Sequence, residues 1–368
     1  MGLGRISYSR VGLFVSLLTY GCQQLPEVEY VTEHAEIGTY FDAPLCAGSI
    51  ARVDESIARY ALLLDAVSSQ KVRIYWGADG VMESCDVAGL HDTLAGCHII
   101  GKNETFADSG SLEHELVHAV GDRIGGMDSF FEEGLAEALS GGIGPAPDFE
   151  RRPSSFVGLS TADFIDTPGS RSTSRHFVQF LIDERGMEPL NELRPLALRG
   201  TTRDQVLEAF HAVYDTPIEA LEDAWVERAP LSYEQLGDLA LPEDQWRGDE
   251  LTIQRTLDCD DVSTMGPLDG VTIPEDFAEQ EGMYQRITFD VADEDSYNLD
   301  LQGSGARARV REEECWIAAD DAPNELELGA DVPVETNMGA CRFSATLWVE
   351  GTTTTAVTLT IRRIEKAG

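Results

Sequence analysis

The sequence is poor in basic residues. It has 27 Lys and Arg against 66 Asp and Glu in 368 residues, which gives a formal net charge of −39. A nucleic-acid partner is therefore not expected, because a phosphate backbone needs Lys and Arg to replace its counterions. Docking on an anionic membrane through a basic patch is not expected for the same reason. The hydrophobic fraction of 42% is typical of a globular protein, and the length favours more than one domain.

Long apolar runs are also lacking. The most apolar stretch near the N-terminus covers only about ten residues after Arg10, which is too short to span a bilayer. A basic start, this apolar run and the pair Gly21-Cys22 predict a lipoprotein-type signal peptide over residues 1–21, with lipidation at Cys22. The protein is thus expected to be exported and lipid-anchored to the bacterial cell envelope, with the outer membrane or surface favoured. A periplasmic or secreted protein is the alternative, and no other membrane contact is expected.

No two cysteines have the CxxC spacing of a thiolate zinc site, so such a site is not expected. In an oxidising compartment, the six cysteines that follow Cys22 predict up to three disulfides, and their number allows several pairings. The expected pairs are Cys85–Cys97, across a short loop with glycines, Cys315–Cys341, and the remaining Cys46–Cys259.

The pattern of apolar residues predicts an α+β protein in several segments. Residues 22–45 are a polar tether with an edge strand over 28–39, and residues 71–76 alternate as a second strand. Further segments with helical spacing cover 49–66, 129–140, 172–185, 188–198, 202–213 and 217–228, and residues 141–170 form a long loop rich in Gly, Pro and Ser. Residues 246–368 contain short alternating runs, which predict an antiparallel β-sandwich as an accessory domain.

The strongest functional signal is the segment His114-Glu-Leu-Val-His118, which lies in a predicted helix. Positions i and i+4 fall on one face of a helix, one turn apart, so both imidazoles can bind one metal ion. Glu115 stands beside the first imidazole, where its carboxylate can reach a metal-bound water. This is the HExxH arrangement of zinc sites.

A second acidic segment, Phe130-Phe-Glu-Glu-Gly-Leu-Ala-Glu137, falls in the next predicted helix. A catalytic zinc needs three protein ligands and one open position. Glu133, with 14 residues between it and His118, is the predicted third ligand. Glu137 lies one turn further on, where it can accept a hydrogen bond from a zinc-bound imidazole. Three nearby carboxylates are the alternatives to Glu133: Glu132, Asp122 and Asp128.

Together, HELVH and FFEEGLAE resemble the gluzincin metallopeptidases, especially the bacterial peptidase-MA-like group, over about residues 110–228. The resemblance implies a zincin-like metallopeptidase domain over residues 46–245, with a small sheet and a mostly helical part that carries the active-site helix. It also implies one catalytic Zn²⁺ bound by His114, His118 and Glu133, with Glu115 as the general base.

Gluzincins usually offer a Tyr or His to the tetrahedral oxyanion. Arg171 stands where related sequences often have Tyr, and His176 nearby is the expected oxyanion donor. The implied activity is hydrolysis of peptide bonds in a peptide or protein substrate, as an endopeptidase. A strand near residues 98–106 is expected to bind that substrate by accepting an extended peptide at a sheet edge.

Two other functions fit the same residues. One is a catalytically inactive lipoprotein that keeps the peptidase fold as a binding or scaffold protein. The other is a zinc amide hydrolase that acts on cell-wall material, because hydrolysis of any amide needs the same polarised carbonyl.

Overall fold

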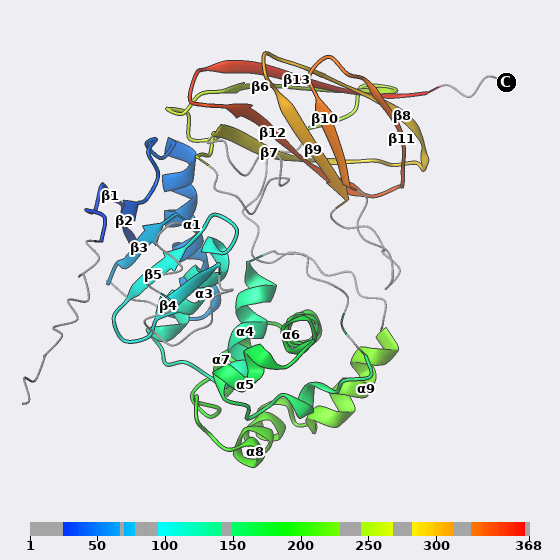
Figure 1. Cartoon of the computed structure of the whole chain (residues 1–368). Helices are drawn as coiled ribbons and strands as arrows, with labels where there is room; N and C mark the ends of the chain where they lie inside the picture. Colours follow the sequence, from blue (N-terminus) through cyan, green and yellow to red (C-terminus); the bar gives the residue numbers. More distant parts are fainter. Residues whose placement is uncertain are drawn as a thin grey trace, which may run out of the picture.

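The computed structural model describes residues 25–66, 70–77, 85, 95–140, 147, 149–228, 244–267, 282–312 and 325–364. The fold is mixed α+β, and its two main parts each have a hydrophobic core (Figure 1). One core lies among the N-terminal sheet and the helices, and the other lies between two C-terminal sheets. The signal peptide and Cys22 lie outside the described residues.

The N-terminal part begins with a five-stranded sheet in the order β1-β2-β3-β5-β4. β2, β3 and β5 run parallel in its centre, whereas β1 and β4 pair antiparallel at its two edges. Most residues of the central strands are buried, as expected for parallel strands that are covered on both faces. The five strands are β1 (Tyr30–Val31), β2 (Ala35–Thr39), β3 (Val72–Trp76), β4 (Gly96–Ile99) and β5 (Glu104–Ala107).

Two expected strands are hairpins instead. Residues 28–39 form β1 and β2, of which only β1 is an edge strand. Residues 98–106 belong to β4 and β5, with a turn between them in which Gly101 and Asn103 have φ of +74° and +56°. Glycine and asparagine tolerate this left-handed backbone better than other residues, which explains the turn at this point.

Helices dominate the rest of this part. They are α1 (Ala47–Leu63), α3 (Leu112–Asp122), α4 (Ser129–Leu139), α5 (Thr161–Asp166), α6 (Ser170–Arg185), α7 (Glu188–Leu193), α8 (Arg203–Tyr214) and α9 (Ile218–Arg228), with a 3₁₀ turn at Pro153–Ser155. The expected helix over 188–198 ends at Leu193, because Pro195 lacks the backbone N–H that would continue it. The expected loop over 141–170 contains the short helix α5.

α4 lies at the centre of the helical core. All but one of its residues are buried, including Phe130 and Phe131, whose rings contact each other edge to face. α6 packs closely against it at Gly134, where a Cβ would lie only 2.8 Å from the Ser174 carbonyl oxygen of α6. The glycine therefore sets how near α6 comes to the acidic residues of α4.

The C-terminal part consists of two four-stranded antiparallel sheets, ordered β10-β9-β12-β7 and β11-β8-β13-β6. Inward-facing residues of both sheets share one apolar core, so the part is a β-sandwich. All eight strands lie within residues 246–368, where the alternating runs predict such a domain. The strands are β6 (Glu250–Leu257), β7 (Gly282–Asp290), β8 (Asp295–Gln302), β9 (Arg307–Glu312), β10 (Glu325–Gly329), β11 (Val334–Met338), β12 (Arg342–Glu350) and β13 (Thr355–Arg363).

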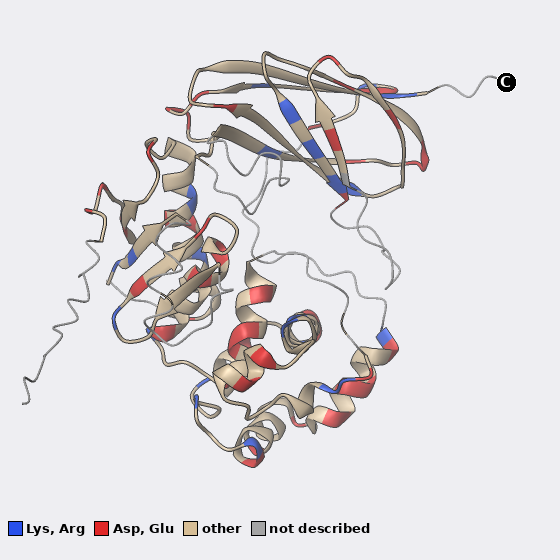
Figure 2. Cartoon of the chain, viewed as in Figure 1, with Lys and Arg blue, Asp and Glu red and all other residues tan. Residues whose placement is uncertain are grey.

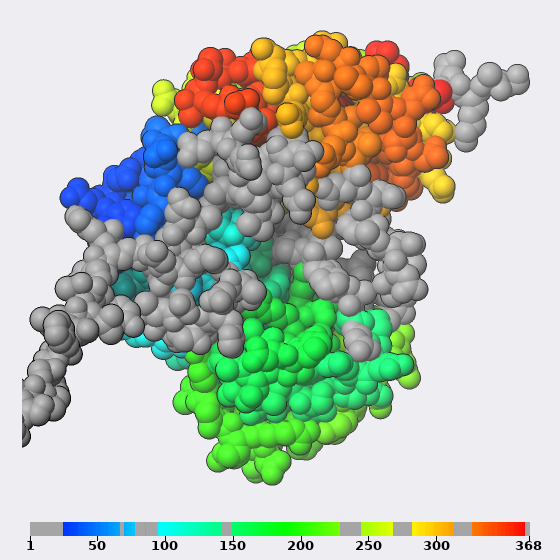
Figure 3. Space-filling view, viewed as in Figure 1, coloured from blue at the N-terminus to red at the C-terminus, as the bar shows by residue number. Residues whose placement is uncertain are grey.

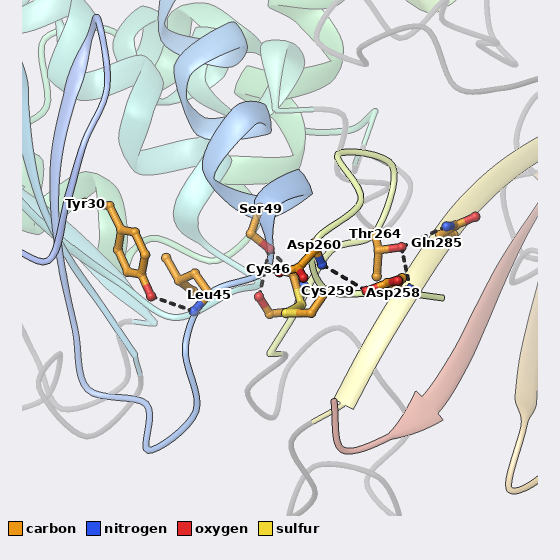
Figure 4. Close-up of a disulfide and its surroundings, with 10 residues drawn as sticks. Tyr30, Leu45, Cys46, Ser49, Asp258, Cys259, Asp260, Thr264 and Gln285 are labelled. Atoms are coloured by element: carbon orange, nitrogen blue, oxygen red, sulfur yellow. Dashed lines mark hydrogen bonds between the residues drawn. A yellow bond between two sulfur atoms is a disulfide. The ribbon is translucent and has the colours of Figure 1, made fainter. Parts of the chain in front are cut away.

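The two parts are joined where α1 begins. A disulfide links Cys46, just before α1, to Cys259, just after β6 (Figure 4). The backbone N–H groups of Cys46, Ala47 and Gly48 donate to carbonyls of residues 259–266, which satisfies the free N–H groups of the helix start. Ser49 also donates to the Gly266 carbonyl, at 3.0 Å. The space-filling view shows the blue N-terminal segment beside the sandwich (Figure 3).

A second disulfide links Cys85 and Cys97, as expected from their spacing. The expected pair Cys315–Cys341 cannot be followed, since Cys315 lies outside the described residues. Disulfides are typical of oxidising compartments, so they indicate an extracellular or periplasmic protein. None of the helices in the described ranges is long and apolar enough to cross a membrane.

Candidate metal centre

Two helices bring the predicted ligands together. α3 carries His114 and His118 on one face, and α4, which follows after a turn, carries Glu133. One ligand atom from each of these three residues lies within 4.8 Å of the other two. The Nε2 atoms of the two imidazoles are 3.0 Å apart, and the Glu133 carboxylate lies 3.5–3.6 Å from them. These are the atoms that a shared cation would need.

The other nitrogen of each imidazole faces a carboxylate of α4. His114 Nδ1 lies 3.6 Å from Glu137 Oε1, and His118 Nδ1 lies 3.8 Å from Glu132 Oε1. Carboxylates behind ligand histidines fix the ring orientation and raise the basicity of the metal-facing nitrogen. Figure 2 shows acidic residues, in red, along the helix that Figure 1 labels α4. Glu137 thus lies behind the His114 imidazole, where the sequence places it. Glu132 lies in the matching position behind the His118 imidazole.

Glu132 is itself held by two buried donors. Its Oε2 accepts hydrogen bonds from the Met127 backbone N–H at 2.8 Å and from Arg194 Nη1 at 3.0 Å. Arg194 and Glu132 form a buried ion pair, with 3% and 4% of their side chains exposed. Glu132 is therefore directed toward His118 rather than toward the point where the three ligand atoms meet.

The donor set fits a metal cation. Glu133 is buried, and its Oε2 has no hydrogen-bond partner among the residues that the structure describes. A buried carboxylate oxygen without a partner is costly, and a bound cation would remove that cost. Two imidazole nitrogens and one carboxylate oxygen are the three-ligand set of a catalytic zinc site that keeps an open position.

The electrostatics indicate an excess of negative charge. Burial lowers the pKa of His118, but the carboxylates of Glu133, Glu132 and Glu115 outweigh it and raise the pKa to about 9. Burial raises the pKa of Glu133, but His118 and His114 lower it to about 2. The metal-free site thus retains a proton on His118 where a cation would otherwise balance the carboxylates.

Glu115 lies beside the cluster on the next face of α3. It is 7% exposed, and burial raises the pKa of its carboxyl group above the ordinary value. Its place depends on Gly96 of β4, where a Cβ would lie 2.8 Å from Glu115 Cγ and 2.6 Å from Ser111 Oγ. Only a residue without a side chain allows the edge strand to pass this close to α3.

The cluster opens into a cleft of about 280 Å³. β4 forms one part of its wall, and the start of α6, α5 and the loops around Gly126 and Arg199 supply the rest. β4 is the last strand of the sheet among the described residues. The Asp108 N–H donates to the Ala95 carbonyl, so by the alternation of an antiparallel ladder the backbone groups of Gly96 and His98 point away from β5.

The expected oxyanion donor His176 does not line this cleft; Arg171 does. Both residues lie on α6, but five positions along a helix correspond to a rotation of about 140°, so they lie on different faces. Arg171 lowers the pKa of both Glu115 and Glu133, which indicates that its charge acts on the cluster.

The alternatives to Glu133 have other partners. Asp122 Oδ2 accepts the Gly101 N–H at 2.9 Å and faces His98 Nε2 at 3.4 Å. Asp128 caps α4, where it accepts the N–H groups of Phe130 and Gly158. Arg194 and Arg199 carry no local sequence pattern, so they could not be predicted. Arg194 reaches Glu132, and Arg199 reaches the cleft wall, only through tertiary packing.

Comparisons with known proteins give no information about the site. No family model and no curated protein match the chain. One solved structure found by comparison is a family GH115 4-O-methyl-α-glucuronidase with specificity for decorated arabinogalactans. The two sequences are 9% identical, the match covers 69% of this chain and 40% of that chain, and the TM-score is 0.18. Another is hydroxypropylphosphonic acid epoxidase from S. wedmorenis, which is 12% identical. This match covers 51% of this chain and 96% of that chain, and the TM-score is 0.13. TM-scores this low define no shared fold.

Proposed function

We propose that this chain is a zinc-dependent hydrolase of peptide bonds that acts outside the cytoplasm. The observation that carries the proposal is the convergence of His114 Nε2, His118 Nε2 and the Glu133 carboxylate beside Glu115, at the wall of an open cleft. In this proposal the N-terminal part is a zincin-like domain of the gluzincin type, in which these three residues bind Zn²⁺. Cys22 is the proposed site of lipid anchoring to the cell envelope.

When bound, zinc supplies Lewis acidity, which polarises the scissile carbonyl and lowers the pKa of water toward neutrality. Glu115 accepts a proton from the attacking water and later delivers it to the leaving amine. Its raised pKa suits both steps, because the carboxyl group must release that proton again. Glu137 and Glu132 hold the two ligand imidazoles in orientation.

Arg171 is the proposed oxyanion donor in place of His176. It lines the cleft, and a guanidinium group offers fixed N–H donors and a positive charge to the oxygen on which negative charge develops. β4 is the proposed substrate strand. The outward backbone groups of Gly96 and His98 can pair with an extended peptide, which would lie across the cleft next to His114.

The first test is the zinc content of the mature chain after dialysis, measured by elemental analysis. About one zinc per chain is expected in the wild type, with loss in Glu133→Ala because one of three ligands is gone. Glu208→Ala, which removes an exposed carboxylate on α8, is the matched control and should keep the metal. Zinc retained by Glu133→Ala at the wild-type level would contradict the three-ligand site.

A chain that binds no zinc, even when zinc is added back, would instead favour the scaffold function. A chain that binds zinc but cleaves only cell-wall amides, and no peptide in a broad peptide mixture, would favour the amide hydrolase.

A further inference from the structure

Two arginines of the cleft wall have no acidic partner among the residues that the structure describes. Arg171 and Arg199 are exposed, and neither forms an ion pair with any residue in the described ranges. This is unusual in a chain with 66 acidic and 27 basic residues. The mechanism above uses Arg171 and gives Arg199 no role.

Arg199 is held in place by its backbone. Its N–H donates to the Gly126 carbonyl at 3.2 Å, and the Asp128 N–H donates to the Ala197 carbonyl at 2.7 Å. These bonds form a short antiparallel bridge between the segment around Leu198 and the turn that joins α3 to α4. The guanidinium group lies against Gly126, with Nη2 3.6 Å from where a Cβ would be.

The same bridge is tied to the metal centre. Met127, in the middle of the turn, donates its N–H to Glu132, and Arg194 binds the same carboxylate from the other segment. Glu132 in turn faces His118. Arg199 is therefore fixed relative to the ligand imidazole through bonded and buried groups, although its own side chain remains open to the cleft.

The two arginines act at different points of the cleft. The charge of Arg171 acts on Glu115 and Glu133, whereas Arg199 is not among the main influences on either carboxyl group. Both arginines line the cleft, and the guanidinium group of Arg199 lies beside Gly126, in the turn between α3 and α4. A substrate whose carbonyl meets Arg171 would present a neighbouring group to Arg199.

The charge balance of the cleft permits an anionic group there. With a dication bound, the formal charges of the residues that line the cleft cancel, although the whole chain carries −39. Salt at physiological strength screens the more distant acidic residues over about 8 Å. A planar guanidinium group without a partner binds a carboxylate through two parallel hydrogen bonds.

We propose that Arg199 binds a carboxylate of the substrate, so that the cleft selects peptides with an acidic group next to the scissile bond. The carboxylate is either an Asp or Glu side chain or the free C-terminus of the peptide. The selection of cleaved peptides rests on the proposed peptidase function, whereas the binding of a carboxylate does not.

The test uses the full mature chain loaded with zinc and a mixture of matched synthetic peptides, followed by mass spectrometry. Pairs of peptides differ by Glu against Gln at one position, or by a free acid against an amide at the C-terminus, which separates the two sources of the carboxylate. The wild type should favour one acidic member by about tenfold in kcat/KM, the value of one charge-assisted hydrogen bond. Arg199→Gln should bring the ratio close to one, mainly through KM.

Arg199→Glu should reverse the preference toward Lys at the same position, which a purely structural role for Arg199 would not produce. Arg247→Gln, the same change at an exposed arginine just before β6, is the control and should leave the ratio unchanged. A wild-type ratio near one, or an unchanged ratio in Arg199→Gln, overturns the inference while the peptidase function stands.

A second readout does not depend on turnover. Fluorescence anisotropy measures binding of the labelled acidic peptide to zinc-loaded Glu115→Gln, with and without Arg199→Gln. If the wild type cleaves no peptide but Arg199→Gln weakens this binding about tenfold, the peptidase function fails and the carboxylate site stands. If neither cleavage nor Arg199-dependent binding is found, both are overturned.

Discussion

The two parts of this protein differ in where their charged side chains lie. The helical part buries ionisable groups next to one another, and Glu115, Glu132, Glu133 and Arg194 are all less than one-tenth exposed. The sandwich keeps most of its ion pairs at the surface, as in the pair of Arg362 with Glu250. Its interior is built from residues such as Leu, Ile, Phe and Val.

This difference supports the proposed site in the helical part. Burying a charge is costly, and charges that persist in a protein interior are paired or bind metal ions. Residues with strongly shifted pKa values are therefore found at functional sites more often than residues in exposed ion pairs are. The sandwich is held mainly by apolar packing between two sheets, and Glu312 is the one charged residue of its described strands that is buried. Four measurements test this difference between the helical part and the sandwich.

The largest effect is expected for Glu115→Gln. Glutamine keeps the shape of the side chain but cannot accept a proton, so peptide hydrolysis should fall about 10²–10⁴-fold. Zinc content should not change, because Glu115 is not one of the three converging ligands. The measurement is kcat/KM beside elemental analysis. A variant that hydrolyses peptides at the wild-type rate would exclude Glu115 as the general base.

Arg194→Met should destabilise the helical part by about 3–5 kcal/mol, because it leaves Glu132 buried without its cation. It should also weaken zinc binding by about 10–100-fold, since Glu132 orients His118. Thermal unfolding and a zinc titration measure the two effects. The matched control is Arg228→Met, which removes a more exposed partner of Glu184 and should cost at most about 1 kcal/mol. Equal losses in both variants would contradict the prediction.

The two disulfides should have different effects. Cys46→Ser with Cys259→Ser removes the covalent link between the parts, so stability should fall by about 2–4 kcal/mol while zinc binding is kept. Cys85→Ser with Cys97→Ser should instead weaken zinc binding or turnover, because Cys97 belongs to the cleft wall. Chemical denaturation and a zinc titration compare the pairs. Loss of zinc in the first pair alone would reverse this assignment.

The smallest effect concerns pH. The pKa of His118 in the folded, metal-free chain is about 9, above its ordinary value of 6.5, so proton binding favours the folded state. This contribution is complete below pH 6.5 and is lost as pH rises through 9. The Tm of the metal-free chain should therefore drop by about 3–6 °C over this range, and by less in His118→Gln. Parallel pH profiles of the two chains would rule the contribution out.

Much of the local structure could be predicted from the sequence. The spacing of His114 and His118 places both on one helical face, and the alternation of residues 71–76 gives β3. Both features follow from periods of 3.6 and 2 residues, which any short segment carries in itself. The hairpin of β4 and β5 was less predictable, since a few residues around Gly101 decide whether the chain continues or turns.

Contacts between distant segments could not be predicted in this way. Glu133 was expected as a ligand from its spacing, but the position of Glu132 behind His118 depends on Arg194, which lies 62 residues further along the chain. The choice between Arg171 and His176 likewise depends on which face of α6 meets α4. Neither relation has a local sequence pattern.

The residues that can bind a metal ion or accept a proton follow from the amino-acid sequence alone, and so does the helix that carries His114, Glu115 and His118. Residue type and helical spacing are properties of the chain alone. The tertiary structure decided which carboxylates face the imidazoles, which arginines open to the cleft and which strand forms its wall. Those relations depend on the packing of α3, α4, α6 and β4, where close approaches at Gly96 and Gly134 fix distances that no single segment contains.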